Sequence, residues 1–181
     1  YTFHELKKQL PSFISHGMEG AVLLFDVDRL QRINDILGYL VGDEVLQRLG
    51  QKCQSMEGVI SYRGPGGKFY CITTEKSESA LDRIYREVQR FSEEVPREMN
   101  LEIQLTISCG VAFFPQDAED FETLHANVEY ALEQAKKVGR GSIAQFSGQM
   151  HRKTVEKFRL QEVLRESVAN NCRGFALVYQ P

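Results

Sequence analysis

The chain has 181 residues, of which 42% are hydrophobic and 26% are charged, and its formal net charge is -3. This length can bury one full core with residues left over, which predicts one domain and a fragment of another. Lys and Arg form no clustered surplus, so the charge gives no reason to expect a nucleic-acid partner. No apolar stretch approaches the roughly 20 residues of a membrane span, and no signal-peptide pattern is present. We therefore expect this part of the protein to be cytoplasmic and without membrane contact, within a parent that could be anchored elsewhere.

The four cysteines have neither CxxC nor zinc-finger spacing, and they are Cys53, Cys71, Cys109 and Cys172. Cys71 and Cys109 lie within apolar runs that are typical of strands. Free cysteine packs as a small hydrophobic residue in a reducing compartment. The sequence therefore predicts buried thiols, not disulfides or metal ligands.

The first predicted strand covers residues 21–25 and ends at Asp26. A continuous apolar run of this kind is typical of a central strand that is covered on both faces. Apolar residues at helical spacing then predict two helices, with Gly38 and Gly42 as the break between them. Their apolar positions are Leu30, Ile33 and Leu37 in the first and Val45, Leu46, Leu49 and Cys53 in the second.

A β-hairpin is predicted next, with strands over 58–62 and 69–73 joined by the Gly-Pro-Gly-Gly turn at 64–67. Helical spacing returns between Leu81 and Phe91, which predicts a further helix.

Two more strands, over 101–107 and 110–114, precede a last helix that buries apolar residues between 121 and 135 and stops at Gly139. This order of elements predicts an α/β sandwich with a central, mainly antiparallel sheet flanked by helices. Such an arrangement is similar to the palm of polymerases and of class III nucleotide cyclases.

Three stretches match motifs of one protein family. The run 25–43 contains Asp-Val-Asp and Asn-Asp, the run 105–112 matches Thr-x-Ser-x-Gly-Val, and 128–136 matches Ala-Asp-x-Ala-Leu-Tyr-x-Ala-Lys. Together they resemble the GGDEF domain, the module that makes cyclic di-GMP, over residues 3 to about 146. The resemblance implies a palm-like nucleotide-cyclase fold with GTP as its ligand.

The sequence changes character after residue 147. A charged amphipathic helix is predicted over 154–170, and 175–181 ends in Tyr-Gln-Pro, which resembles the first strand of an EAL domain, the phosphodiesterase module for cyclic di-GMP. We therefore expect a degenerate GGDEF domain over 1–147 and, over 148–181, a linker helix with the first strand of an EAL domain. The resemblance also implies an EAL domain in cis and a homodimeric parent protein.

The catalytic half of the resemblance is incomplete. Joining two GTP molecules uses two divalent cations about 4 Å apart, and such cations prefer carboxylate ligands. The resemblance assigns metal ligands to Asp26 and to the carbonyl of Val27, but an ungapped alignment of the acidic hairpin places Gly67 and Lys68 at its two acidic positions. The metal site is therefore predicted to be vestigial, with no catalytic residues and at most weak Mg²⁺ binding together with GTP.

The nucleotide-binding half is better preserved. The resemblance assigns guanine recognition to Asn34 and Asp43, and triphosphate binding to Lys136 and Arg140. Gln31 replaces the Lys common in the family and Tyr39 replaces a His, so weaker phosphate binding is expected. The inhibitory Arg-x-x-Asp motif that precedes the family hairpin is missing, because no Arg lies between 48 and 63.

Structural alternatives exist for these residues. Asp26 and Asp28 follow a strand and could bond turn amides. Asp43 could cap a helix that begins at Glu44, and Lys136 and Arg140 could interact with a helix dipole.

Three functions stay open on the sequence. They are a catalytically inactive regulatory domain that binds GTP and modulates an EAL domain, a dimerisation or protein-interaction module without nucleotide binding, and an active diguanylate cyclase. The active cyclase would need a replacement carboxylate near Gly67, and the nearest along the chain is Glu75.

Overall fold

A computed structural model describes residues 1–149, 152, 159–160 and 163–165. The chain divides into two units, Tyr1–Phe146 and Ser147–Pro181. Residues 159–160 and 163–165 are helical, but the other residues of the predicted helix 154–170 and the whole predicted strand 175–181 lie outside the described residues. Within the described part, no helix combines the length and the apolar character that crossing a bilayer requires.

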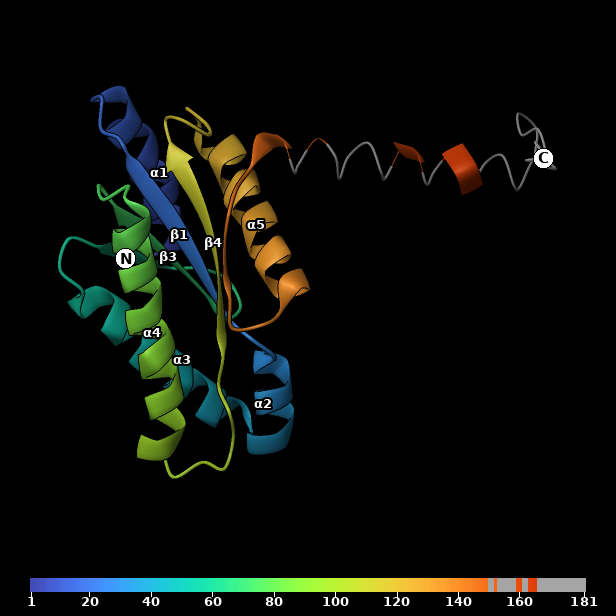
Figure 1. Ribbon diagram of the computed structural model, residues 1–181. Coiled ribbons are helices and arrows are strands. Elements are labelled where there is room, and N and C mark those ends of the chain that lie inside the picture. The colour runs from blue at the N-terminus through green and yellow to red at the C-terminus, as the bar shows by residue number, and fades with distance from the viewer. Residues whose placement is uncertain (150–151, 153–158, 161–162, 166–181) are drawn as a thin grey trace, which may run out of the picture. The chain divides into compact units, whose positions relative to one another are not determined.

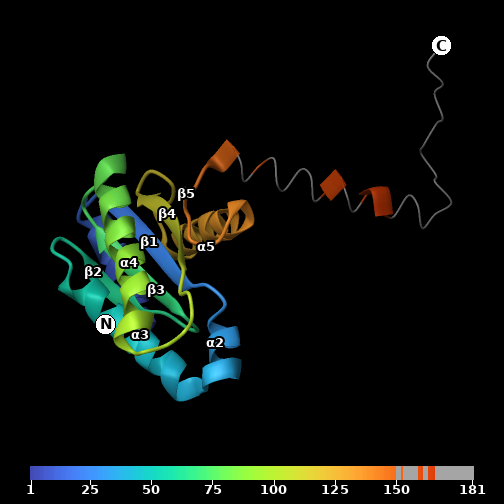
Figure 2. The ribbon, with the colours of Figure 1, turned by 60° about the horizontal axis from the view of Figure 1, so that its bottom comes forward.

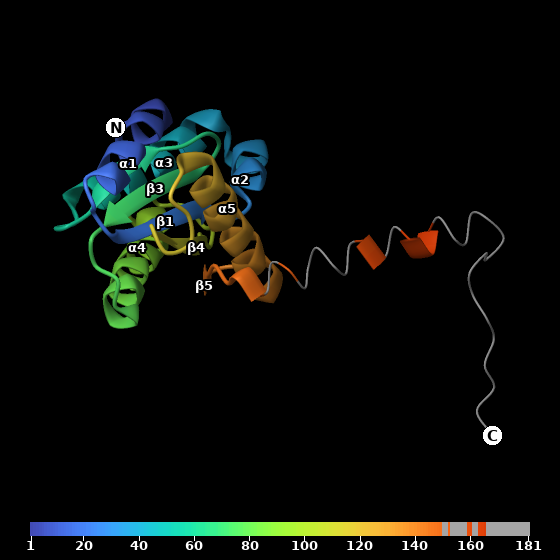
Figure 3. The same ribbon diagram turned by 90° about the horizontal axis from the view of Figure 1, so that it is seen from above.

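Five strands form one sheet in the order β2-β3-β1-β4-β5 (Figures 1 and 2). The strands are β1 (Gly20–Val27), β2 (Ile60–Arg63), β3 (Lys68–Thr73), β4 (Ile107–Phe114) and β5 (Ile143–Gln145). All neighbours are antiparallel except β4 and β5, which run parallel. Figure 3 shows β1 between β3 and β4. The predicted α/β fold, with a mainly antiparallel central sheet, is confirmed.

Five helices of the first unit cover the two faces of this sheet. They are α1 (Phe3–Ser15), α2 (Leu30–Leu37), α3 (Tyr39–Ser55), α4 (Glu78–Glu98) and α5 (Phe121–Val138). Because side chains alternate along a strand, Leu23 and Phe25 of β1 join a core with α3 and α4, whereas Val22 and Leu24 join a second core with α1 and α5. Figure 1 shows α4 and α5 on opposite sides of the sheet.

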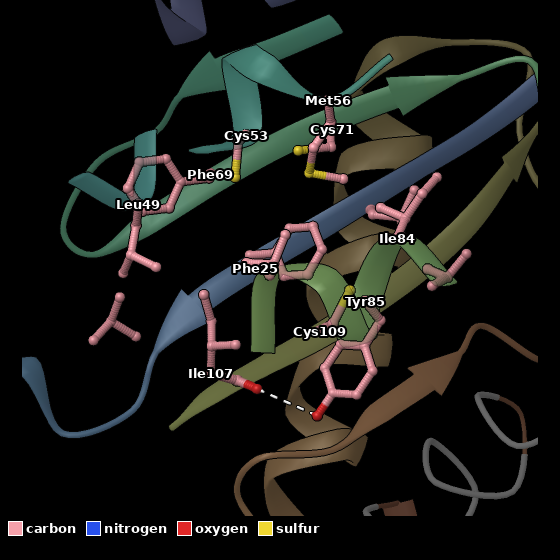
Figure 4. Close-up of a cluster of buried hydrophobic side chains, with 14 of the residues drawn as sticks. Phe25, Leu49, Cys53, Met56, Phe69, Cys71, Ile84, Tyr85, Ile107 and Cys109 are labelled. Atoms are coloured by element: carbon pink, nitrogen blue, oxygen red, sulfur yellow. Dashed lines mark hydrogen bonds between the residues drawn. The ribbon is translucent and has the colours of Figure 1, made fainter. Parts of the chain in front are cut away.

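The predicted burial of the thiols is confirmed for the three cysteines that the structure describes. Cys53, Cys71 and Cys109 are free and buried in the core beneath α3 and α4 (Figure 4). A hydrogen bond with Cys53, together with burial, raises the pKa of Cys71, and burial raises the pKa of Cys109. Cys71 and Cys109 are therefore protonated packing groups.

Two predicted boundaries are wrong. Residues 101–106 form no strand, because β1 ends at Val27, opposite Ile107, and no strand lies beside the earlier residues for them to pair with. Gly38 alone separates α2 from α3, and its positive φ of 89° suits a glycine. Gly42 and Asp43 lie inside α3, so Asp43 does not cap a helix that begins at Glu44.

Candidate functional site

The hairpin turn is held beside the end of β1. Arg63 donates hydrogen bonds to the carbonyls of Gly66 at 3.1 Å and Lys68 at 3.3 Å, and its guanidinium lies 4.5 Å from the centre of the Phe69 ring. Across the sheet, Asp26 is the direct partner of Lys68. The turn therefore has a defined position next to the predicted metal ligand.

Gly67 occupies the position that faces Asp26. The amide of Val27 donates to the Gly67 carbonyl at 3.2 Å. A Cβ atom built on Gly67 would lie 2.9 Å from Cδ2 of Leu30, 3.4 Å from Asp26 Oδ1 and 3.5 Å from the Cβ of Val27. An acidic side chain at this position would therefore start beside Asp26, with a shift of the Leu30 side chain, but glycine supplies no carboxylate.

Asp26 already has a cationic partner. The ammonium of Lys136, in the last turn of α5, forms an ion pair with Oδ2 of Asp26. The exposed fractions of these side chains are 25% for Lys136 and 15% for Asp26. The structure thus joins a residue predicted to bind phosphate to a residue predicted to bind metal. Arg140, the second predicted phosphate ligand, follows α5 and is exposed.

Lys68 forms an ion pair with Glu129, a residue that the sequence did not predict to belong to the site. Its Nζ lies 2.7 Å from both carboxylate oxygens of Glu129 on α5. The hydroxyl of Tyr70 also donates to Glu129, at 3.3 Å, and lies 2.9 Å from Nε2 of His125. Burial, and then the negative charge of Glu129, raise the pKa of Tyr70, so this hydroxyl stays protonated. The spacing of seven residues from Glu129 to Lys136, which places both on one helix face, was the available signal.

Asp28 has a structural role. Its buried carboxylate accepts hydrogen bonds from the hydroxyls of Thr106 and Ser108, each at 2.9 Å, and from the amide of Gly141 at 3.0 Å. These bonds join the end of β1 to the segments that enter β4 and β5. Asp28 therefore has the structural role that the sequence left open for it. Its donors are two hydroxyls and one amide, where turn amides were expected.

The residues at the end of β1 do not fit a pair of divalent cations. Gly67 offers no side chain, Lys68 is cationic, and Asp26 is paired with Lys136. Across the described residues, no three His, Cys, Asp or Glu side chains gather where they could hold a metal ion. Glu75 cannot replace the missing carboxylate, because it follows Thr73, which pairs with Ala21 at the opposite end of β1 from Asp26.

The predicted guanine ligands lie at the corner between α2 and α3. Oδ1 of Asn34 is buried and has no hydrogen-bond partner among the described residues. It lies against Gly42, where an added Cβ would meet this oxygen at 1.8 Å. Asp43, the next residue of α3, is exposed and lines a groove of about 480 Å³ together with Arg63 and Phe69. Burial lowers the pKa of Arg63, and the charge of Asp43 opposes that effect.

Comparison with known proteins identifies a matching family and several relatives. The family described as "Diguanylate cyclase, GGDEF domain" matches residues 1–142. The cyclic di-GMP phosphodiesterase NbdA of Pseudomonas aeruginosa is 29% identical over 166 residues, which cover 89% of this chain and 21% of NbdA. The cyclic di-GMP phosphodiesterase PdeR of Escherichia coli is 26% identical over 184 residues, which cover 97% of this chain and 27% of PdeR. The chain thus spans well under half the length of these curated relatives.

Solved structures share the fold. The active GGEEF domain of a diguanylate cyclase from Vibrio cholerae superposes with a TM-score of 0.69 at 20% identity, over 81% of this chain and 97% of that one. At this level of identity the likeness concerns the fold alone. The sheet and its flanking helices are therefore those of a known architecture, whatever chemistry the side chains support.

Proposed function

The chain belongs to the GGDEF family of cyclic di-GMP signalling, and we propose that it is a catalytically inactive member that binds GTP and regulates an adjacent EAL domain. The observation that carries the proposal is the pairing of Asp26 with Lys136 opposite Gly67. A displacement at phosphorus by a two-metal mechanism needs cations that stabilise both the attacking and the leaving oxygen. At the end of β1 the carboxylate of Asp26 is neutralised by Lys136, so it is not free to bind such cations.

GTP binding is proposed from the corner between α2 and α3. A buried amide oxygen without a donor is costly, and here Oδ1 of Asn34 is in that state. The edge of guanine carries N–H donors from which the exposed carboxylate of Asp43 could accept hydrogen bonds, and Asn34 could do the same if its amide turned away from Gly42. Adenine lacks these donors on the matching edge, so GTP is expected to bind in preference to ATP.

The inactivity is tested by incubating the purified chain with GTP and either Mg²⁺ or Mn²⁺, and separating the products by chromatography. We expect no cyclic di-GMP at any concentration of either cation. Product that disappears in Asp26→Ala would show that the domain is an active cyclase. Calorimetric titration with GTP, and with ATP as the control nucleotide, tests binding separately.

Regulation in cis is proposed from the EAL-like ending of the sequence and from relatives that are named phosphodiesterases. In the full-length protein, GTP is expected to change the affinity of the EAL domain for cyclic di-GMP or its turnover. A flexible Gly-Ser insertion beside Gly148 should abolish this effect while both ligands still bind. An EAL domain indifferent to GTP, with GTP binding confirmed, would contradict this part of the proposal.

A second candidate is a dimerisation or protein-interaction module. It is favoured by three apolar side chains at the turn between α2 and α3, because Ile36, Tyr39 and Leu40 are 63%, 72% and 87% exposed. Sedimentation of the wild-type chain and of Leu40→Asp would test whether this surface joins two copies. Self-association that Leu40→Asp removes, in a chain that binds neither nucleotide, would favour this candidate.

A further inference from the structure

Two ion pairs tie neighbouring strands to the same face of α5. Asp26 of β1 and Lys68 of β3 are direct cross-strand partners. Both lie on the side of the sheet that packs against α5, because Leu24 and Tyr70, two residues away on the same strands, belong to that core. From α5, Lys136 reaches Asp26 and Glu129 reaches Lys68.

The charges of these four residues cancel within the protein. Glu129 and Lys136 are two helical turns apart, so they stand on one line along α5 and meet two adjacent residues of the sheet. The side chains are a quarter exposed or less in the Asp26 pair, and about a quarter exposed in the Lys68 pair. No excess of negative charge remains here that would attract a cation.

A divalent cation at Asp26 would have to displace an ammonium group. Mg²⁺ and Mn²⁺ require several oxygen ligands and give up water reluctantly. At this position they would find one carboxylate that is already bonded, a glycine where a second carboxylate would stand, and Lys68 nearby. Both the competition with Lys136 and the shortage of ligands oppose metal binding.

We propose that the ammonium of Lys136 has taken the place of a divalent cation at Asp26, and that the domain binds its nucleotide in the metal-free form. This inference rests on the proposed binding of GTP. An ammonium has three N–H donors, so Lys136 can hold Asp26 with one and offer the others to phosphate oxygens. The fixed positive charge of Lys136 then attracts and partly neutralises the phosphate oxygens, which a bound divalent cation would otherwise do.

The sign of the Mg²⁺ effect follows from this assignment. Mg²⁺ bound to GTP neutralises part of the triphosphate charge, which weakens its attraction to Lys136. In calorimetric titrations of the chain, GTP in EDTA should bind as tightly as GTP in excess Mg²⁺, or more tightly. Affinity that falls about tenfold or more in EDTA would overturn the proposal.

Lys136→Met supplies the matched test, because methionine keeps an unbranched apolar stem without the charge. This variant leaves Asp26 unopposed, so GTP should bind about tenfold or more weakly in EDTA, and Mg²⁺ should restore part of the loss. Lys137→Met, on an exposed neighbour in the same helical turn, is the control and should behave as the wild type does. Equal effects of the two substitutions would contradict a specific role for Lys136.

A nucleotide-free measurement separates this inference from the proposed function. Free Mn²⁺ gives an electron paramagnetic resonance signal that disappears on binding. The wild-type chain should leave Mn²⁺ free up to about 1 mM, and Gly67→Asp with Lys136→Met should bind it about tenfold more tightly than Gly67→Asp alone. Wild-type binding of Mn²⁺ that Asp26→Ala removes would overturn the inference. A chain that binds neither GTP nor Mn²⁺ would refute GTP binding, and with it the metal-free nucleotide complex, but would leave the replacement of a cation by Lys136 at Asp26 standing.

Discussion

The two ends of the candidate site differ in whether their polar side chains have partners within the protein. At the end of β1, both Asp26, the predicted metal ligand, and Lys68 of the hairpin are paired with side chains of α5. At the corner between α2 and α3, the oxygen of Asn34 is buried without a donor, and Asp43 is open to solvent. One end is closed by the protein itself, whereas the other presents the exposed carboxylate of Asp43 to its groove, with Asn34 Oδ1 buried behind it against Gly42.

This difference is the basis for proposing that recognition and catalysis are separable in this domain. The two ends meet at the hairpin, because Asp43 lines its groove together with Arg63 and Phe69. Their side chains differ in origin, since the partners that close the first end come from α5, whereas Asn34 and Asp43 belong to α2 and α3. An unmet hydrogen-bonding capacity costs stability, and the unmet oxygen of Asn34 would have to turn away from Gly42 to meet a ligand beside Asp43.

The comparison assumes that the end of β1 is held rigidly by internal bonds, and Asp28→Ala tests this most severely. The substitution removes the acceptor for Thr106, Ser108 and the amide of Gly141. Leaving the buried Ser108 hydroxyl and the partly buried Gly141 amide unpaired should lower the free energy of unfolding by about 2–4 kcal/mol, as measured by urea denaturation. Asp35→Ala, at an exposed position of α2, is the control and should change it by less than about 0.5 kcal/mol. Similar losses in both variants would mean that the hydrogen bonds of Asp28 do not stabilise the folded protein.

The open end is tested by Asp43→Ala. Removing one hydrogen-bonding partner of a ligand costs about 1–3 kcal/mol, so the dissociation constant for GTP should rise by one to two decades in calorimetry. Gln47→Ala, one turn along α3 in the same groove, should have a much smaller effect. An unchanged affinity in Asp43→Ala, or equal affinities for GTP and ATP in the wild type, would favour the protein-interaction module.

Much of the fold could be predicted from sequence because its signals are local. The apolar run of β1 ends at Asp26, and the helical spacing of α5 ends before Gly139, as predicted. The pairing of Asp26 with Lys136 could not be predicted in this way, because these residues are 110 positions apart and a local pattern does not record the partner.

The predicted start of α3 at Glu44 is wrong for a related reason. Gly42 looks like a helix breaker by propensity, yet it lies inside the helix. The structure gives its purpose, since any side chain there would collide with Asn34. A glycine required by a tertiary contact and a glycine that ends a helix look the same in a single sequence.

That contact makes Gly42→Ala a sharper test of the corner. In the wild-type background the new methyl group would collide with the Asn34 amide, and we expect a loss of about 1 kcal/mol in the free energy of unfolding. In the Asn34→Ala background the collision is absent, and the better helix propensity of alanine should stabilise the protein by about 0.5–1 kcal/mol. Urea denaturation of the four proteins measures both signs. A substitution with the same effect in both backgrounds would show that Asn34 does not lie against Gly42 in solution.

The smallest expected effect concerns the pair Lys68 and Glu129, and it tests whether the closed end is held by its charges. A partly exposed ion pair contributes about 0.5–1 kcal/mol, and two short contacts to one ammonium place this pair toward the upper part of that range. A double-mutant cycle with Lys68→Met and Glu129→Gln, followed by urea denaturation, isolates this coupling energy from the effects of each substitution alone. The same cycle at 1 M NaCl should give a smaller coupling, because salt screens exposed charges. Coupling near zero at low salt would mean that hairpin and helix meet without a stabilising bond, and the contrast between a closed end and an open end would then depend on Lys136 and Asp26 alone.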